Sequence, residues 1–488
     1  MRRAWLLLPV LVACASPEGE AAYRPLACGE AAAGEVTEVA SFLGNARGLS
    51  MGECGHLSWT TPDGDVVRLE PGLEGPETLA TAAAGATLSQ AGDQLLLRDT
   101  EGGVTWRRLP DGEAHRVEAS AQGFARLGDR ELAWACGGGE IGVFDEEGFT
   151  PLVDDVATCA GLALAPGAPV LLYVGPEDLL RRIRLDTGAS IGLPEVPFIA
   201  VRGDQLSLSR DGRLLVHRPV RASQHVGLFD LEADERFLGA IEVRSHQVLQ
   251  AGDHTLAIYG TEGAYVVTPD GWVNLYEGGD VWALSEDGER ALIYFEGTDA
   301  EDRRFEVATL DDFTSERLEL PTHGVLGLAG RSEDGGAVVI QLRTADGDVR
   351  LFRGRWTDGA LEELTPPGLN PRVYWVADDG ATLVHVNDDA AALVDPSGEI
   401  AARFANVGTL SARATARGAL LQIRDRDFRE QRLIAVRGDG TQRTLFSGES
   451  LQQVLLDRGG ARVAFTTFGP DEADPTMFRT TVWAGAPH

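Results

Sequence analysis

One phrase recurs along this chain: an apolar run, a turn that contains Asp and Gly, and a second apolar run. Its clearest copy spans Val281 to Phe295, where Ser285-Glu-Asp-Gly288 separates the two runs. Asp287 can hydrogen-bond its own backbone and Gly288 can adopt a positive φ, so the chain reverses and the runs form a β-hairpin. The other clear copies turn at Ser209 to Gly212, Ser332 to Gly335 and Ala377 to Gly380.

Weaker copies of this turn extend the repeat to about eleven units between Gly55 and Gly460, with a mean period of roughly forty residues. Each unit carries a second turn, as at Pro269-Asp-Gly271 and Asp395-Pro-Ser-Gly398. Two turns per period separate short strands and leave no room for long helices. The sequence therefore predicts an all-β fold, a β-propeller of four-stranded antiparallel blades with about eleven repeat units.

The strongest units have a common form, Leu-Ser-x-Asp-Gly followed by an apolar strand, at Leu208 to Val216 and Leu284 to Ile293. This form resembles the repeat of the Tol-associated periplasmic propeller family and its WD40-like relatives, and the resemblance covers nearly all of Gly48 to Gly485. It implies a binding platform. It supplies no catalytic residues to carry over, because functions on propellers reside in individual loops.

The last unit contains three strands, so a fourth must come from elsewhere to cover its open edge. We expect two rings. Residues 23–243 would form a first propeller of about five blades, closed by the spare strand Glu35 to Gly44. Residues 244–488 would form a second propeller of about six blades, completed by Glu235 to Val243. A single large ring is the main alternative.

The N-terminus has the features of a targeting segment. Arg2-Arg3 precedes an apolar run, Ala4 to Val12, that is too short to span a bilayer. Leu11-Val12-Ala13-Cys14 then resembles the lipobox of bacterial lipoproteins. The resemblance implies a signal peptide over residues 1–13, a lipid on Cys14, and a tether over residues 14–22. An ordinary signal peptide followed by a cysteine is the alternative.

These N-terminal features predict a location in the bacterial cell envelope, on the periplasmic or the surface side. Ala15 rather than aspartate follows the cysteine, which by the same resemblance favours the outer membrane. The remaining cysteines are even in number, as expected for disulfides in an oxidising compartment. Three pairings can connect Cys28, Cys54, Cys136 and Cys159. The sequence-local pairs, Cys28 with Cys54 and Cys136 with Cys159, are preferred because each would tie neighbouring repeats.

The chain carries 75 acidic and 43 basic residues, a formal net charge of −32. This balance disfavours nucleic acids and anionic membrane surfaces as partners, so the lipid anchor would be the only membrane contact. Loops between the second and third strands of the later units are acidic and would share one face. They would bind calcium or a cationic partner, or remain a solvated surface. The residues concerned are Asp299, Glu301, Asp302, Asp388, Asp389, Asp471, Glu472 and Asp474.

No catalytic residue is predicted. Gly48-Leu-Ser-Met-Gly52 matches the string of a serine-hydrolase elbow, but that elbow requires an α/β sheet that the repeat leaves no room for. The expected function is an exported, lipid-anchored propeller that binds an envelope protein or polymer, with calcium as the one candidate cofactor. The alternative is a propeller enzyme that acts on glycans or peptides through carboxylates in its channel.

Overall fold

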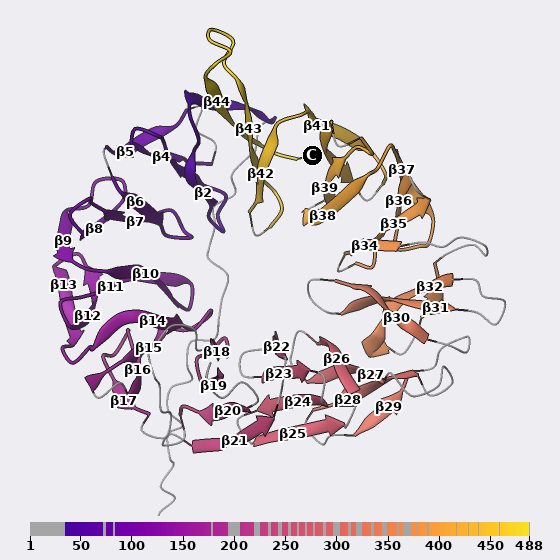
Figure 1. Cartoon of the computed structure of the whole chain (residues 1–488), viewed down its shortest axis with the longest axis horizontal. Coiled ribbons are helices and arrows are strands. Elements are labelled where there is room, and N and C mark those ends of the chain that lie inside the picture. Colours follow the sequence, from indigo (N-terminus) through magenta and orange to yellow (C-terminus); the bar gives the residue numbers. More distant parts are fainter. Residues whose placement is uncertain are drawn as a thin grey trace, which may run out of the picture.

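The computed structural model is built from short antiparallel strands that follow one another around a ring (Figure 1). It describes residues 35–487 except for 72–74, 82, 177–178, 194–204, 219–224, 233–235, 243–245, 252–254, 261–262, 269–270, 277–278, 286–288, 296–302, 311–313, 319–324, 333–335, 344–348, 359–360, 365–371, 378, 388–389, 416, 428, 438 and 458. In this part of the chain the strands form eleven four-stranded antiparallel sheets.

Ten of these described sheets use four strands that are consecutive in the sequence. The first five contain β2 (Arg47–Met51), β3 (Leu57–Thr60), β4 (Val66–Leu69) and β5 (Glu77–Ala80); β6 (Gly85–Leu88), β7 (Gln94–Arg98), β8 (Gly103–Arg108) and β9 (Ala114–Glu118); β10 (Ala121–Leu127), β11 (Arg130–Gly137), β12 (Glu140–Asp145) and β13 (Gly148–Val153); β14 (Thr158–Leu164), β15 (Val170–Val174), β16 (Leu180–Arg184) and β17 (Ser190–Gly192); β18 (Gln205–Leu208), β19 (Leu214–Arg218), β20 (His225–Asp230) and β21 (Arg236–Glu242).

The next five continue the same order around the ring. They contain β22 (His246–Ala251), β23 (Thr255–Gly260), β24 (Gly263–Thr268) and β25 (Gly271–Tyr276); β26 (Gly279–Leu284), β27 (Arg290–Phe295), β28 (Arg304–Thr309) and β29 (Ser315–Arg317); β30 (Val325–Arg331), β31 (Ala337–Arg343), β32 (Val349–Arg355) and β33 (Glu362–Glu363); β34 (Arg372–Val376), β35 (Thr382–Asn387), β36 (Ala390–Val394) and β37 (Ile400–Ala405); β38 (Thr409–Thr415), β39 (Gly418–Arg424), β40 (Gln431–Arg437) and β41 (Gln442–Gly448).

The remaining sheet joins the two ends of the described chain. It pairs β42 (Leu451–Leu456), β43 (Val463–Pro470) and β44 (Phe478–Gly485) with β1 (Thr37–Leu43), in the order β1-β44-β43-β42. A 3₁₀ helix, η2 (Trp356–Asp358), follows β32. No helix within the described residues combines the length and the apolar character needed to cross a membrane.

The repeated turn joins the first and second strands of a sheet, as the sequence predicts. Between β18 and β19, Gly212 has a φ of 74° and the Ser209 hydroxyl accepts the backbone N–H of Leu214 at 2.9 Å. The serine thus closes the turn with its side chain, and glycine supplies the left-handed conformation. The same bond joins Ser89 to Gln94, Ser285 to Arg290, and Ser332 to Ala337.

The apolar core lies between neighbouring sheets. Leu172 of β15 and Leu215 of β19 belong to one buried cluster, and Tyr173 of β15 packs in another with Ala125 of β10. Because β15 faces a neighbouring sheet on each side, all five of its residues are buried. Stacked sheets of this kind are β-propeller blades, and the propeller prediction is confirmed.

The prediction of two rings is wrong. The spare strand β1 pairs with β44 of the last sheet, with Thr37 opposite Ala484 and Leu43 opposite Arg479. The strand expected to complete a second ring is β21, which pairs with β20 in its own sheet. Figure 1 shows one ring, so the boundary predicted between residues 243 and 244 loses the closure on which it depended.

The ring closes through packing and hydrogen bonds between its first and last sheets. Leu57 of β3 and Ala464 of β43 belong to the same buried cluster. Gln453 Nε2 donates to the Leu49 carbonyl at 3.1 Å, and Arg462 Nη1 donates to the Gly55 carbonyl at 3.2 Å. One continuous interface therefore joins residues that lie about four hundred positions apart in sequence.

The predicted disulfide between Cys136 and Cys159 is confirmed. It joins the end of β11 to the start of β14, so it ties two neighbouring sheets across a sequence separation of 23 residues. Cys54 is also disulfide-bonded, to a partner outside the described residues. Cys14 and Cys28 lie in the N-terminal part that the structure does not describe.

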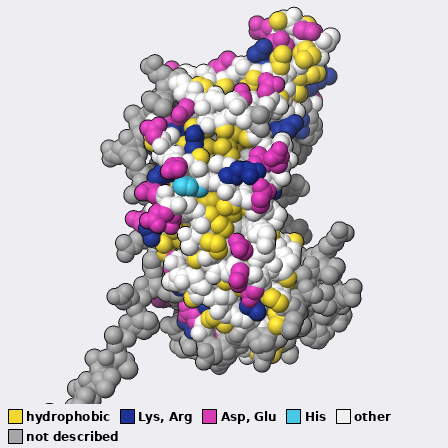
Figure 2. Space-filling model, turned by 90° about the vertical axis from the view of Figure 1, so that its left-hand side faces the viewer, with side chains coloured by type: hydrophobic (Ala, Val, Ile, Leu, Met, Phe, Trp, Pro, Cys, Tyr) yellow, Lys and Arg dark blue, Asp and Glu magenta, His cyan; other side chains and the backbone are white. Residues whose placement is uncertain are grey.

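The outer rim of the early sheets carries mixed side chains. Figure 2 shows acidic and basic groups interspersed with apolar ones on the side where these sheets end. Exposed ion pairs are present there, such as that of Arg116 on β9 with Asp99 at 2.8 Å. Pairs of this exposure contribute little to folding, but they keep such a surface soluble.

Candidate functional site

A hollow of about 320 Å³, with polar and apolar side chains in its walls, lies where the first strands of four consecutive sheets run into their turns. It collects side chains from the turn after β2, from β6 and its turn, from β10 with the start of β11, and from the end of β14 with its turn. Only the ring brings these segments together. The lining residues are Glu53, Thr87, Leu88, Gln90, Phe124, Arg126, Glu131, Leu164, Ala165 and Pro166.

Gln90 sits at the corner of the turn that Ser89 closes, and its side chain is exposed. Its amide oxygen accepts the backbone N–H of Glu53 at 3.2 Å, and its carbonyl accepts the N–H of Cys54 at 3.5 Å. The turn of the second sheet is therefore bonded to the turn of the first. This contact holds the backbone of Glu53 at the edge of the hollow.

An ion pair crosses the hollow between Arg126 and Glu53. The Arg126 Nη2 and Glu53 Oε2 atoms are 3.0 Å apart, with side-chain exposures of 6% and 20%. The two residues belong to sheets that are separated by the sheet β6–β9. A charge pair so poorly solvated is much less screened than one at the rim, and it holds both side chains in a defined position.

Glu131 is the second carboxylate of the hollow. Its Oε2 atom accepts the N–H of Ala91 at 3.2 Å, while its backbone carbonyl accepts Nε2 of Gln94 at 3.0 Å. Burial raises the pKa of the Glu131 carboxyl, and the backbone N–H groups of Ala91 and Gln90 and the charge of Arg126 oppose that rise in part. The group therefore binds its proton more tightly than an ordinary glutamate.

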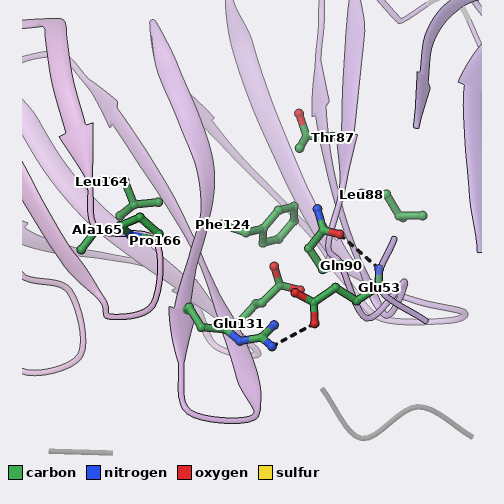
Figure 3. Close-up of a pocket in the computed structure, with 10 residues that line it drawn as sticks. Glu53, Thr87, Leu88, Gln90, Phe124, Glu131, Leu164, Ala165 and Pro166 are labelled. Atoms are coloured by element: carbon green, nitrogen blue, oxygen red, sulfur yellow. Dashed lines mark hydrogen bonds and ion pairs between the residues drawn. The ribbon is translucent and has the colours of Figure 1, made fainter. Parts of the chain in front are cut away.

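Figure 3 shows the side chains of Glu53, Gln90 and Glu131 converging, with Phe124 beside them and Leu164 farther along the wall. Carboxylate and amide oxygens at such a place can accept hydrogen bonds from a charged or hydroxyl-bearing group. The aromatic and aliphatic side chains can cover its apolar part. Such an arrangement can hold a ligand through charge and hydrogen bonds.

The predicted acidic residues that the structure describes do not line the hollow. Only the loop between β43 and β44 is described, and there Asp471 accepts Nε of Arg479 at 2.9 Å. Asp474 accepts the N–H and the hydroxyl of Thr476 at 3.0 and 2.7 Å, and these bonds lower the pKa of its carboxyl. Glu472 lies in the same loop. These bonds make Asp471 and Asp474 part of the loop's own structure.

The other predicted acids, Asp299, Glu301, Asp302, Asp388 and Asp389, lie outside the described residues. Within the part that is described, no group of three or more His, Cys, Asp or Glu side chains is arranged to hold a metal ion. The sequence did not single out Glu53, Arg126 or Glu131. The one available signal was Gln90, which occupies the exposed position after the serine in the repeated turn.

No protein-family model matches the sequence, and no curated protein matches it. Among solved structures, a crystal structure of a eukaryotic initiation factor is similar over 67% of this chain and 87% of that one, with 12% identity and a TM-score of 0.42. The Dos1 propeller is similar over 66% and 90%, with 10% identity and a TM-score of 0.36. The tricorn protease is similar over 91% of this chain and 54% of its own, with 10% identity and a TM-score of 0.31.

Proposed function

We propose that this chain is an exported, lipid-anchored β-propeller that serves as a binding scaffold in the bacterial cell envelope. The observation that carries the binding role is the hollow, since four consecutive sheets each place side chains at one spot on the ring. The partner is an envelope protein or polymer. The volume of the hollow is at the small end for ligand pockets, so the hollow suits part of a larger partner better than a whole cofactor.

The proposed location in the cell envelope has support that is independent of the binding role. The segment that ends at Cys14 resembles a lipobox, and the disulfide between Cys136 and Cys159 is the kind of bond that persists in an exported protein. The Leu-Ser-x-Asp-Gly turns add the resemblance to the Tol-associated periplasmic propellers. We also infer that each of the eleven described sheets is one blade of the ring, because each contributes to the clusters between neighbours.

Site-specific photo-crosslinking tests the binding role. Thr87 is exposed and lines the hollow, so a photoreactive residue there should form a covalent adduct with the partner in native membranes. Arg116 is exposed on the outer strand β9 and is the matched control position. We expect a discrete adduct from position 87 alone. Equal labelling from both positions, or none from position 87, would contradict the proposal.

The same membranes test the anchor. The parent should fractionate with membranes and incorporate labelled fatty acid, whereas Cys14→Ser should lose both properties because lipidation requires the thiol. Persistent labelling of the variant would show that Cys14 is not the acceptor. The crosslinked adduct and the fatty-acid label are independent readouts, so the experiment can contradict the binding role and the lipid anchor separately.

One observation favours a second candidate, a hydrolase acting on glycans or peptides. Glycoside hydrolysis uses two carboxyl groups, one of which stays protonated because its pKa is raised. Burial raises the pKa of Glu131, and Glu53 lies in the same hollow. Purified protein should then release product from a panel of envelope glycans or peptides, and Glu131→Gln should abolish turnover. Absence of turnover by the parent removes this candidate.

A further inference from the structure

We propose that the hollow lined by Glu53, Phe124, Arg126 and Glu131 is a receptor for one cationic group on an apolar stem, the chemistry of an arginine or lysine side chain. This inference rests on the proposed scaffold function and names the class of chemical group that the hollow binds on the partner. It places recognition at the turns between first and second strands. The acidic loops predicted from the sequence join second strands to third strands, and the one that is described, between β43 and β44, does not line the hollow.

The charges that line the hollow determine which sign of charge a ligand must carry. Two carboxylates, Glu53 and Glu131, and one guanidinium, Arg126, line it. Arg126 lies 3.0 Å from Glu53, and Glu131 accepts an N–H from Ala91, a group without net charge. The charge of Arg126 also acts on Glu131 and lowers its pKa, while Asp93, at the base of the same turn, adds a negative charge that raises it. A cation entering beside Glu131 balances this excess, whereas an anion is repelled.

Burial is the main reason that the pKa of Glu131 is raised, so its negative charge is poorly solvated in the absence of a ligand. A guanidinium or ammonium group would restore the solvation that burial removes, through a charge-assisted hydrogen bond. The long-range field acts in the same direction, because a chain with a net charge of −32 attracts cations toward its surface.

The remaining walls match the stem of such a side chain. Phe124 and Leu164 offer aromatic and aliphatic surface, and a cation near an aromatic ring gains roughly 0.5–1 kcal/mol at an exposed site, equivalent to about a two- to fivefold gain in affinity. Leu88 adds a third apolar residue. The side-chain amide of Gln90 stands beside the carboxylates, where it can bond to a donor group.

Calorimetric titration of the purified full-length protein tests the inference. The probes are N-acetyl-arginine amide and its neutral isostere N-acetyl-citrulline amide, which differ in charge and hardly in shape. We expect the arginine derivative to bind at least about tenfold more tightly, the loss typical of removing one charged hydrogen bond. Equal binding of the two, or no binding of either, overturns the proposal.

A second comparison identifies the source of the cation. 1,4-Diaminobutane carries the charge without a peptide unit. If the group belongs to a protein partner, the acetylated arginine or lysine amides bind more tightly than this diamine. If the diamine binds more tightly than both, the hollow is a polyamine site and the assignment to a partner's side chain is overturned.

Variants locate the binding. Glu131→Gln keeps an oxygen that can accept the N–H of Ala91, and it should weaken the arginine derivative by about tenfold. The control, Glu118→Gln, removes a carboxylate from the outer strand β9, where the side chain is 69% exposed, and should leave affinity unchanged. Unchanged affinity in Glu131→Gln would place the cation elsewhere. If that variant fails to fold, Phe124→Leu should still weaken binding by about twofold or more.

These results separate the inference from the scaffold function. A crosslinked partner together with no preference for cations would leave a scaffold that recognises its partner by other means. A clear preference for the arginine derivative without any crosslinked partner would leave a cation site on a protein with a different role.

Discussion

At the scale of single residues, His56 is a deeply buried ionisable group beside the hollow, with 4% of its surface exposed. Its Nε2 atom lies 3.1 Å from the Ser89 carbonyl, and two glycines make room for the ring. A Cβ atom on Gly52 would lie 2.0 Å from Cε1 of His56, and one on Gly92 would lie 2.6 Å from Nδ1. Burial lowers the pKa of His56 to about 4, and the nearby charge of Arg68 contributes to the same shift.

This pKa makes folding stability depend on pH. Below about pH 6.5 the unfolded chain takes up a proton at position 56, whereas the folded protein does not until pH 4 is approached. The free energy of unfolding should therefore fall as pH decreases through this window, by roughly 2 kcal/mol from His56 between pH 7 and pH 5. Urea unfolding at the two pH values measures it.

The matched variants are His56→Gln, which should reduce the difference between the two pH values, and His115→Gln on the outer strand β9, which should retain it. An identical pH dependence for His56→Gln and the parent would show that His56 is not the responsible group.

Sequence reasoning could not find this histidine or the hollow next to it. His56 and Glu131 each stand alone in the sequence, without a motif around them. Their environment arises because turns of different sheets meet, as when the Ser89 carbonyl of the second sheet reaches His56 of the first. Contacts of this kind depend on how neighbouring sheets stack, which a single repeat does not encode.

At the scale of the elements, buried arginines bridge neighbouring sheets. Arg68, Arg182 and Arg353 lie on third strands, β4, β16 and β32, and are 4%, 5% and 6% exposed. Each donates to a carbonyl of the next sheet, at Gly92, Leu231 and Gly380, over 2.9–3.0 Å. The planar guanidinium can satisfy several carbonyls at once, which suits it to this position.

Arg353 makes further bonds to the carbonyls of Asp395 at 2.6 Å and Pro396 at 2.8 Å, both in the turn between β36 and β37 of the next sheet. Arg353→Met leaves these acceptors unpaired, so we expect the free energy of unfolding to fall by roughly 3 kcal/mol. The free energy of unfolding of Arg353→Lys should lie between those of the parent and of Arg353→Met, because an ammonium group cannot bond to several carbonyls as the planar guanidinium does. Chemical denaturation measures both.

The control for this series is Arg403→Met, which removes an exposed arginine from β37. It should change stability by less than about 0.5 kcal/mol. A loss in the control as large as that in Arg353→Met would mean that positive charge, rather than the bridge, stabilises the ring.

The elements themselves were well predicted because their causes are local. The turn at Ser209 to Gly212 needs a side-chain oxygen and a residue with positive φ, and both are legible in the sequence. The bridging arginines were not predicted. Arg353 is one of three arginines in β32, and nothing in the strand distinguishes it from the other two, because its acceptors lie 27 to 43 residues further along the chain.

At the scale of the whole molecule, the pairing of β1, near the N-terminus, with β44, near the C-terminus, decides the architecture. The repeat predicted a propeller, and the incomplete last unit predicted that a spare strand covers its open edge, but the strand expected there was Glu235 to Val243 rather than β1. The number of rings could not be read in the same way, since a spare strand fits any unpaired edge equally well in sequence. Packing of Leu57 against the cluster that contains Ala464 makes the first and last sheets neighbours, and so selects one ring.

Removing β1 should therefore open the ring at its closure. Val39, Ala40 and Phe42 pack on the cluster shared by the first and last sheets, and β1 covers the edge of β44. A chain that begins at residue 45 should lose this cover, aggregate through the open edge and unfold at lower temperature. The matched control begins at residue 35 and keeps β1, and both chains carry Cys54→Ser because both lack the partner of its disulfide. Light scattering after gel filtration and thermal unfolding distinguish them, and a peptide of residues 35–44 added to the shorter chain should restore the monomer. If the two chains are equally monomeric and unfold at the same temperature, the pairing of β1 with β44 does not hold the ring closed.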